Sequence, residues 1–155
     1  MSRSLISEIV SERALLRRLL STYRGLLDGC QEKEPDQDQL PAFASILHSF
    51  YTGIENIFKR VVTELDGQAP RGETWHSDLL SRMTQPSPKR PAVISESLSQ
   101  TLRGYMGFRH VFRHAYSFEL SWRKIKSLVL GMDDTLSRLE SELDHFQASL
   151  ESPSA

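Results

Sequence analysis

Residues 40–65 constrain the fold more strongly than any other stretch, because their apolar side chains recur at three- and four-residue steps around a wide arc of a helix. These side chains are Phe43, Ile46, Leu47, Phe50, Tyr51, Ile54, Ile57, Phe58, Val61 and Val62. So wide an apolar face has to be covered from two sides. The segment therefore predicts a central core helix, which tolerates Pro41 in its first turn and which Gly67 ends.

The flanking sequence predicts further helices of the same bundle. Residues 4–27 place leucine and isoleucine side chains at helical spacing, and Gly29 suits the end of that helix. One or two helical turns are expected around residues 78–83, within a long proline-containing loop. Ser95 has the side chain of an N-cap and is expected to begin a third long helix.

The last helix has the most regular spacing. From a start near Ser117, its apolar residues alternate three and four positions apart: Trp122, Ile125, Val129, Met132, Leu136, Leu139, Leu143, Phe146 and Leu150. Such a heptad seam predicts near-parallel packing, either inside a bundle or against a second copy of the chain. Together these segments predict an all-α protein, an antiparallel bundle of four to five helices.

Length and composition are consistent with this class. A chain of 155 residues with 39% hydrophobic content suits one domain, expected over residues 1–151 with a frayed tail at 152–155. The single cysteine, Cys30, excludes an intramolecular disulfide framework. No apolar run approaches the roughly 18 residues of a membrane span, and charged residues occupy the N-terminal stretch where a signal peptide needs an apolar core. We therefore expect a cytoplasmic protein that has no membrane partner.

Chemically active side chains concentrate in residues 107–116, Gly-Phe-Arg-His-Val-Phe-Arg-His-Ala-Tyr. Here Arg109, His114 and Tyr116 follow the pattern Arg-x4-His-x-Tyr, and Gly107 would loosen the preceding helix. Residues five apart on a continuous helix lie about 140° from each other, so Arg109 and His114 cannot share one helical face. Either the helix breaks between them, or the two side chains serve different neighbours.

This pattern resembles the signature of HepT-like toxins, a branch of the HEPN superfamily of small all-α proteins, and the helical layout is compatible over most of the chain. The resemblance implies a homodimer in which Arg109 and His114 form a ribonuclease site across the subunit interface, with no metal and no cofactor. It also implies that Tyr116 is the residue that a cognate MntA-like nucleotidyltransferase antitoxin modifies with AMP.

The residue types suit this chemistry. The His114 imidazole can take a proton from a ribose 2′-hydroxyl or give one to the departing 5′-oxygen. The Arg109 guanidinium can donate two hydrogen bonds to the phosphate as negative charge builds up on the phosphate oxygens. Two copies would supply two such pairs, which gives a physical reason for a dimeric site, and His110 and Arg113 would add phosphate contacts. An AMP group on Tyr116 would place a bulky anion over the cationic site and repel the substrate.

Charge is distributed unevenly, although the formal net charge is only -1. Residues 103–126 are strongly basic, and residues 133–151 are strongly acidic. A nearly neutral chain has no general attraction for polyanions, so any contact with RNA has to come from a local zone such as 103–126.

Other interpretations of the cluster stay open. Its cations are also favourable at a helix C-terminus, where they interact with the helix dipole without any catalytic role. His110 and His114 have the i, i+4 spacing that zinc ligands often use. However, Val111 stands where the zinc-protease pattern has Glu, and no cysteine cluster offers further ligands, so a metal site is not expected.

Two polar features outside the cluster also have two interpretations each. Glu55 and Asn56 either orient a catalytic histidine from a neighbouring helix or form the polar edge of a buried helix. Trp75 and His76 either stack on an RNA base, or Trp75 covers the core beneath the long loop. The packing interpretation is favoured in both cases.

The sequence thus predicts a HepT-like endoribonuclease toxin that is homodimeric and is neutralised by an MntA-like partner. The alternative is a catalytically silent helical adaptor of the same fold, which binds a nucleotidyltransferase or a nucleotide. A dimerising coiled-coil scaffold without a site is a third possibility.

Overall fold

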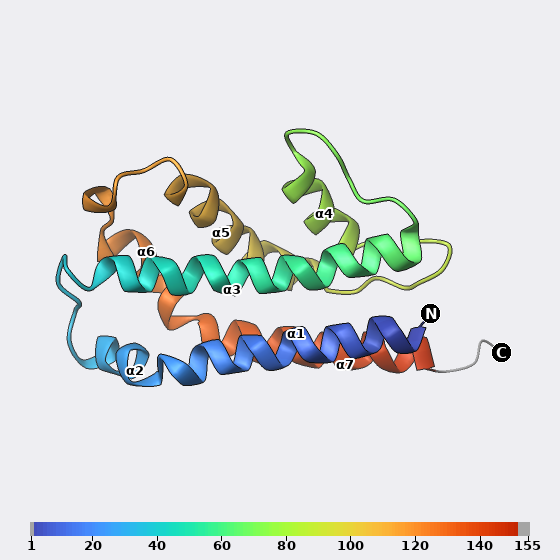
Figure 1. Ribbon diagram of the computed structural model, residues 1–155, viewed down its shortest axis with the longest axis horizontal. Helices are drawn as coiled ribbons and strands as arrows, with labels where there is room; N and C mark the ends of the chain where they lie inside the picture. The colour runs from blue at the N-terminus through green and yellow to red at the C-terminus, as the bar shows by residue number, and fades with distance from the viewer. Residues whose placement is uncertain (1, 152–155) are drawn as a thin grey trace.

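In the computed structural model, residues 2–151 are described, and they form helices joined by loops, without a strand in that range (Figure 1). The α-helices are α1 (Ser2–Thr22), α2 (Arg24–Glu32), α3 (Leu40–Val61), α4 (Trp75–Met83), α5 (Glu96–Phe112), α6 (Trp122–Leu130) and α7 (Met132–Glu151). The predicted all-α class is confirmed, while the predicted tail at 152–155 lies outside the described residues. Within residues 2–151, no helix combines the length and apolarity needed to cross a bilayer.

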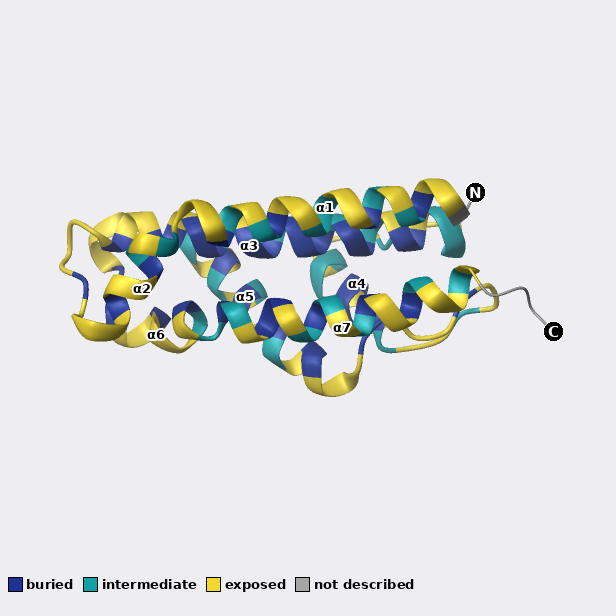
Figure 2. Cartoon of the chain, turned by 90° about the horizontal axis from the view of Figure 1, so that it is seen from below, coloured by how far each residue is buried: buried dark blue, intermediate teal, exposed yellow. Residues whose placement is uncertain are grey.

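Helix α3 is the central element, as predicted, and α1, α4, α5 and α6 all pack against it. In Figure 1 it runs through the middle of the molecule, with α1 and α7 on one side and α4 and α5 on the other. Its contact with α1 is close because Gly53 has no side chain: a Cβ there would lie 2.7 Å from the nearest methyl of Leu16. Figure 2 shows the resulting pattern, with buried faces turned inward and exposed faces outward.

Two predicted helices are each divided, which is why the chain has more helices than the predicted four to five. The first breaks at Tyr23, and Gly29 lies inside α2, so the prediction that the helix ends at Gly29 was wrong. The last breaks at Gly131 into α6 and α7. There the Tyr105 hydroxyl donates a hydrogen bond to the carbonyl of Leu128 (2.6 Å). In a continuous helix this carbonyl would accept from a backbone N–H of the next turn, so the hydroxyl competes with that helical hydrogen bond.

The heptad seam packs inside the chain. Its residues from Trp122 to Phe146 are buried in the same core as α3, so the seam is not left free for a second copy. The acidic side of α7 is also used internally, because Arg13 pairs with Asp144 and Arg24 with Asp133, each at 2.8 Å, and Arg17 pairs with Glu140. Arg13 and Arg17 of α1 and Arg24 of α2 therefore hold these two helices to α7 by charge, in addition to the packing of α1 on α7.

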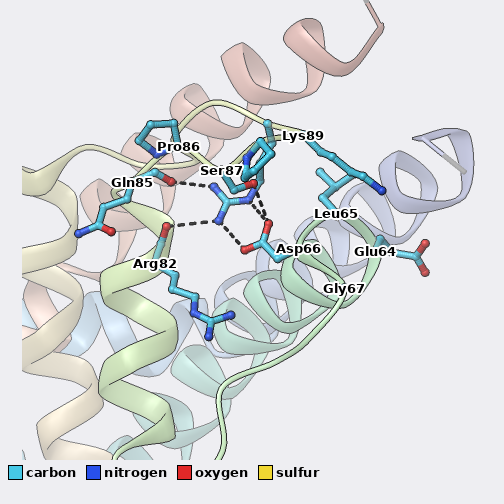
Figure 3. A pocket seen from close by; sticks show the side chains of 11 residues that line it. Glu64, Leu65, Asp66, Gly67, Arg82, Gln85, Pro86, Ser87 and Lys89 are labelled. Atoms are coloured by element: carbon cyan, nitrogen blue, oxygen red, sulfur yellow. Dashed lines mark hydrogen bonds and ion pairs between the residues drawn. The ribbon is translucent and has the colours of Figure 1, made fainter.

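The end of α3 anchors the long loop that follows it. A π-helical turn at Val62–Asp66 extends α3, and Gly67 ends it as predicted, with a φ of 81° that glycine adopts without steric cost. The buried Arg90 side chain donates from Nε and Nη2 to the two carboxylate oxygens of Asp66, both at 2.8 Å, and from Nη1 to the carbonyl of Gln85 (2.9 Å). Figure 3 shows these bonds converging beside Asp66. They fix the loop on both sides of α4.

The same contacts keep the Asp66 carboxyl ionised. Burial alone opposes ionisation, but the hydrogen bonds from Arg90 and Ser87 outweigh it and lower the pKa of Asp66. The ion pair is thus an internal one, with a guanidinium only 1% exposed.

We expect Arg90→Met to lower the free energy of unfolding by about 3–5 kcal/mol, because it leaves the Asp66 carboxylate in a partly buried position without its counter-ion. Chemical denaturation measures this loss. The exposed neighbour supplies the control: Lys89→Met should change the same quantity by less than about 0.5 kcal/mol. Equal effects of the two substitutions would contradict an anchoring role for Arg90.

Candidate functional site

Helix α5 carries the predicted cluster. It begins as expected, because the Ser95 hydroxyl accepts a hydrogen bond from the backbone N–H of Leu98 (3.1 Å). It passes through Gly107, which was expected to loosen it, and ends at Phe112. The helix therefore ends between Arg109 and His114, and the two residues lie in different local structures.

Arg109 is buried between α5 and α3, with only 7% of its surface exposed. Its Nη2 donates to Glu55 Oε1 (2.8 Å), and its Nη1 donates to the Thr52 hydroxyl (3.3 Å). The guanidinium carbon also lies 5.0 Å from the centre of the Tyr51 ring, within reach of a cation–π interaction. A buried cation needs such partners, and here Glu55 supplies the charge that balances it.

His76 is the third member of this group, which we call the Glu55 triad: Glu55, His76 and Arg109. The Nδ1 atom of His76 lies 2.6 Å from Glu55 Oε2 and 2.9 Å from Arg109 Nη2. Helix α4, which residues 78–83 predicted only in part, brings this imidazole over α3 and α5. Of the two interpretations of Glu55, the geometry matches the one in which it orients a histidine from a neighbouring helix.

The residue beside it, Asn56, contacts a different partner and donates to Glu12 Oε1 (3.3 Å). Trp75 is half-buried against the core, as the packing interpretation predicts, and its ring lies 3.5 Å from that of His76. The Lys59 ammonium sits 4.7 Å from the centre of the Trp75 ring.

The Glu55 triad opens onto a cavity of about 310 Å³ between α4 and α5. His76 and Arg109 line it together with the exposed His110 and Arg113. Glu73 is the acidic residue of its lining. The cavity thus gathers two imidazoles and two guanidinium groups, a set of donors that suits a phosphate group.

His114 and Tyr116 lie beyond the end of α5, on an exposed turn. The His114 ring is 5.5 Å from that of His110, but His114 does not line the cavity that Arg109 reaches. Tyr116 is 70% exposed and stacks on Phe118, with ring centres 5.3 Å apart. Within one chain, the structure therefore places Arg109 and His114 in different surroundings.

Charge and burial near Arg109 shift the titration of neighbouring groups. Burial, and then the charges of Arg109 and Arg113, lower the pKa of His48, whose ring lies 6.5 Å from that of Phe112. Burial raises the pKa of Tyr51, and the Glu55 carboxylate raises it further. Both shifts favour the neutral form of the group, with burial as the main cause and these charges adding to it.

A family model described as HepT-like protein matches residues 42–150, which span α3 to α7 and the whole Glu55 triad. The chain belongs to the HepT-like family. This makes it a HEPN-type protein, related to the proteins of toxin–antitoxin systems. No curated protein and no solved structure matches this HepT-like chain.

Sequence reasoning did not identify His76 as a partner of Arg109. The available signal was Glu55, a carboxylate close in sequence to the apolar Tyr51, Ile54 and Phe58 of the predicted core helix, because such a group requires a cation or donors from neighbouring elements. Residues 2–151 contain no group of three or more histidine, cysteine or acidic side chains that would hold a metal.

We expect Arg109→Met to lower the free energy of unfolding by about 3–5 kcal/mol, since it removes the cation that balances the buried Glu55. Chemical denaturation of this variant and of Arg113→Met makes the test. Arg113 is an exposed residue on the same cavity, so its substitution should cost less than about 0.5 kcal/mol. Similar losses would show that Arg109 is not a structural cation.

Proposed function

We propose that this HepT-like protein is the toxin of a HepT/MntA-type toxin–antitoxin system, a metal-independent endoribonuclease that cleaves RNA by attack of the 2′-hydroxyl. The observation that carries the proposal is the surface at the end of α5. There the exposed side chains of His110, Arg113 and His114 lie close in the chain to the exposed, stacked rings of Tyr116 and Phe118. Cations that bind phosphate and aromatic rings that stack on bases are the two components of single-stranded RNA recognition.

The chemistry follows from the residue types. His114 transfers a proton, either from the ribose 2′-hydroxyl or to the departing 5′-oxygen. Arg109 stabilises the negative charge that develops on the phosphate, with His110 and Arg113 as further contacts. The expected products are a 2′,3′-cyclic phosphate and a 5′-hydroxyl, and no metal takes part.

The separation of Arg109 and His114 within one chain is the reason for proposing a homodimer. Beside His114, α5 presents Val111, which is 63% exposed, and the stacked rings of Phe108 and Phe112, which are only half-buried. A second copy that covers this apolar strip would bring its own His114 toward the first copy and complete a composite site.

A catalytically silent adaptor is the second candidate, and one observation favours it. The Arg109 guanidinium is committed to Glu55 and Thr52, so part of its hydrogen-bonding capacity is used inside the fold. An adaptor would retain this arrangement for stability alone, and would bind a nucleotidyltransferase or nucleotide.

The two candidates differ in one assay. We expect the purified protein to cleave single-stranded RNA in EDTA and to leave cyclic phosphate ends, and His114→Ala to slow cleavage by about 100-fold or more. His145, exposed on α7, supplies the control, because His145→Ala should cleave at the wild-type rate. Equal, negligible cleavage by all three proteins would favour the adaptor. A monomeric mass by light scattering for an active protein would contradict the composite site.

Tyr116 is the proposed site of AMP transfer by the MntA-like antitoxin, since its hydroxyl is carried by a 70% exposed side chain close to His114. After incubation with the nucleotidyltransferase and ATP, we expect mass spectrometry to find AMP on the Tyr116 peptide and the RNA cleavage rate to fall. Tyr116→Phe should remain unmodified and active. Modification of the exposed Tyr23 instead would contradict the assignment.

A further inference from the structure

The Glu55 triad contains an imidazole whose orientation fixes its chemistry. A carboxylate oxygen only accepts hydrogen bonds, so the contact of 2.6 Å between Glu55 Oε2 and His76 Nδ1 requires a hydrogen on Nδ1. In the neutral ring, Nε2 then carries the lone pair. Arg109 Nη2 also lies 2.9 Å from Nδ1, but it has its own acceptor in Glu55 Oε1 (2.8 Å) and does not need Nδ1 as one.

The other nitrogen of this ring is the one left for a ligand. Nδ1 is engaged with Glu55, and His76 lines the space of about 310 Å³, so Nε2 is the ring nitrogen that a ligand in this space would meet. The His76 side chain is 28% exposed, whereas that of Glu55 is 3% exposed. A carboxylate behind an imidazole, with the other nitrogen toward a ligand, is the arrangement of a general base held in one tautomer.

The surroundings of His76 suit a phosphate diester. Arg109, His110 and Arg113 line the same cavity, and the loop that carries α4 is fixed to α3 through Arg90 and Asp66. The imidazole is therefore held by its own hydrogen bond, by its ring contact with Trp75 and by an anchored helix. Such support is what keeps a catalytic group in place.

We propose that His76 is a catalytic residue of the RNA cleavage, namely the general base, and that Glu55 is its positioning residue. This inference rests on the proposed function. His76 Nε2 removes the 2′-hydroxyl proton, the 2′-oxygen bonds to phosphorus, and the bond from phosphorus to the 5′-oxygen breaks. That oxygen takes a proton from the protonated imidazole of His114, and exchange with water restores both rings. A pair of His114 residues is then not needed for the two proton transfers.

The base and the acid are distinguished by a substrate whose bridging 5′-oxygen is replaced by sulfur. A thiolate leaves without being protonated far more readily than an alkoxide, because thiols are much more acidic than alcohols. We expect His76→Gln and His114→Ala each to slow cleavage of ordinary RNA by about 100-fold or more. With the sulfur-bridged substrate, His114→Ala should recover to near the wild-type rate, and His76→Gln should stay slow.

Each result decides a different claim. A wild-type protein that cleaves neither substrate overturns the proposed function and this inference with it. Wild-type rates for His76→Gln, with a slow His114→Ala, leave the ribonuclease standing and overturn the role of His76. Recovery of His76→Gln on the sulfur-bridged substrate overturns its assignment as the base. His145→Gln, on α7, serves as the control and should match the wild type on both substrates.

A second measurement does not depend on a substituted protein. The imidazole nitrogen chemical shifts of wild-type His76, measured by NMR, distinguish the two neutral tautomers. We expect the hydrogen on Nδ1, as the contact with Glu55 requires. A hydrogen on Nε2 would overturn the proposal, because that nitrogen could not then accept a proton.

Discussion

A single carboxylate on the buried side of the central helix determines how the site is built. Helix α3 is buried along most of its length, and Glu55, 3% exposed, places a negative charge among its apolar neighbours. Removing that charge from water is costly unless cations and donors replace the lost hydration. Arg109 from α5 and His76 from α4 supply them. The positions of two helices relative to α3 thus depend on one electrostatic requirement as well as on packing.

The same requirement gives Arg109 two roles that have to be kept apart. As a buried counter-ion of Glu55 it belongs to the fold, and as a lining residue of the cavity it is available to a phosphate. Loss of activity in an Arg109 variant therefore carries no mechanistic meaning unless the variant is shown to be folded. His114 has no such ambiguity, because it lies on an exposed turn beyond the end of α5. Arg109 is buried and His114 is exposed on a separate turn. This arrangement is consistent with a site that needs further groups to complete it.

The connection between α3 and α5 has a definite structural purpose. In the sequence it is a long irregular segment with several prolines, to which no role could be assigned. In the structure, Arg90 fixes it to Asp66 at the end of α3, and α4 lies across α3 and α5 as a result. The segment delivers His76 to Glu55, and this contact converts a loop of unexplained length into part of the candidate site.

The sequence by itself determined the helical class, the central place of residues 40–65, the Ser95 cap and the cluster at 107–116, because periodicity and capping are local properties of the chain. The spacing of Arg109 and His114 left two possibilities, a helix end between them or different neighbours for the two side chains, and the structure shows the helix end. Only the tertiary structure decided that the heptad seam is buried inside the chain and that the last helix breaks at Gly131, next to the bond from Tyr105 to Leu128. It also decided that Arg109 contacts Glu55 and His76 rather than His114. These outcomes depend on which side chains meet across elements far apart in sequence, and no local pattern encodes that.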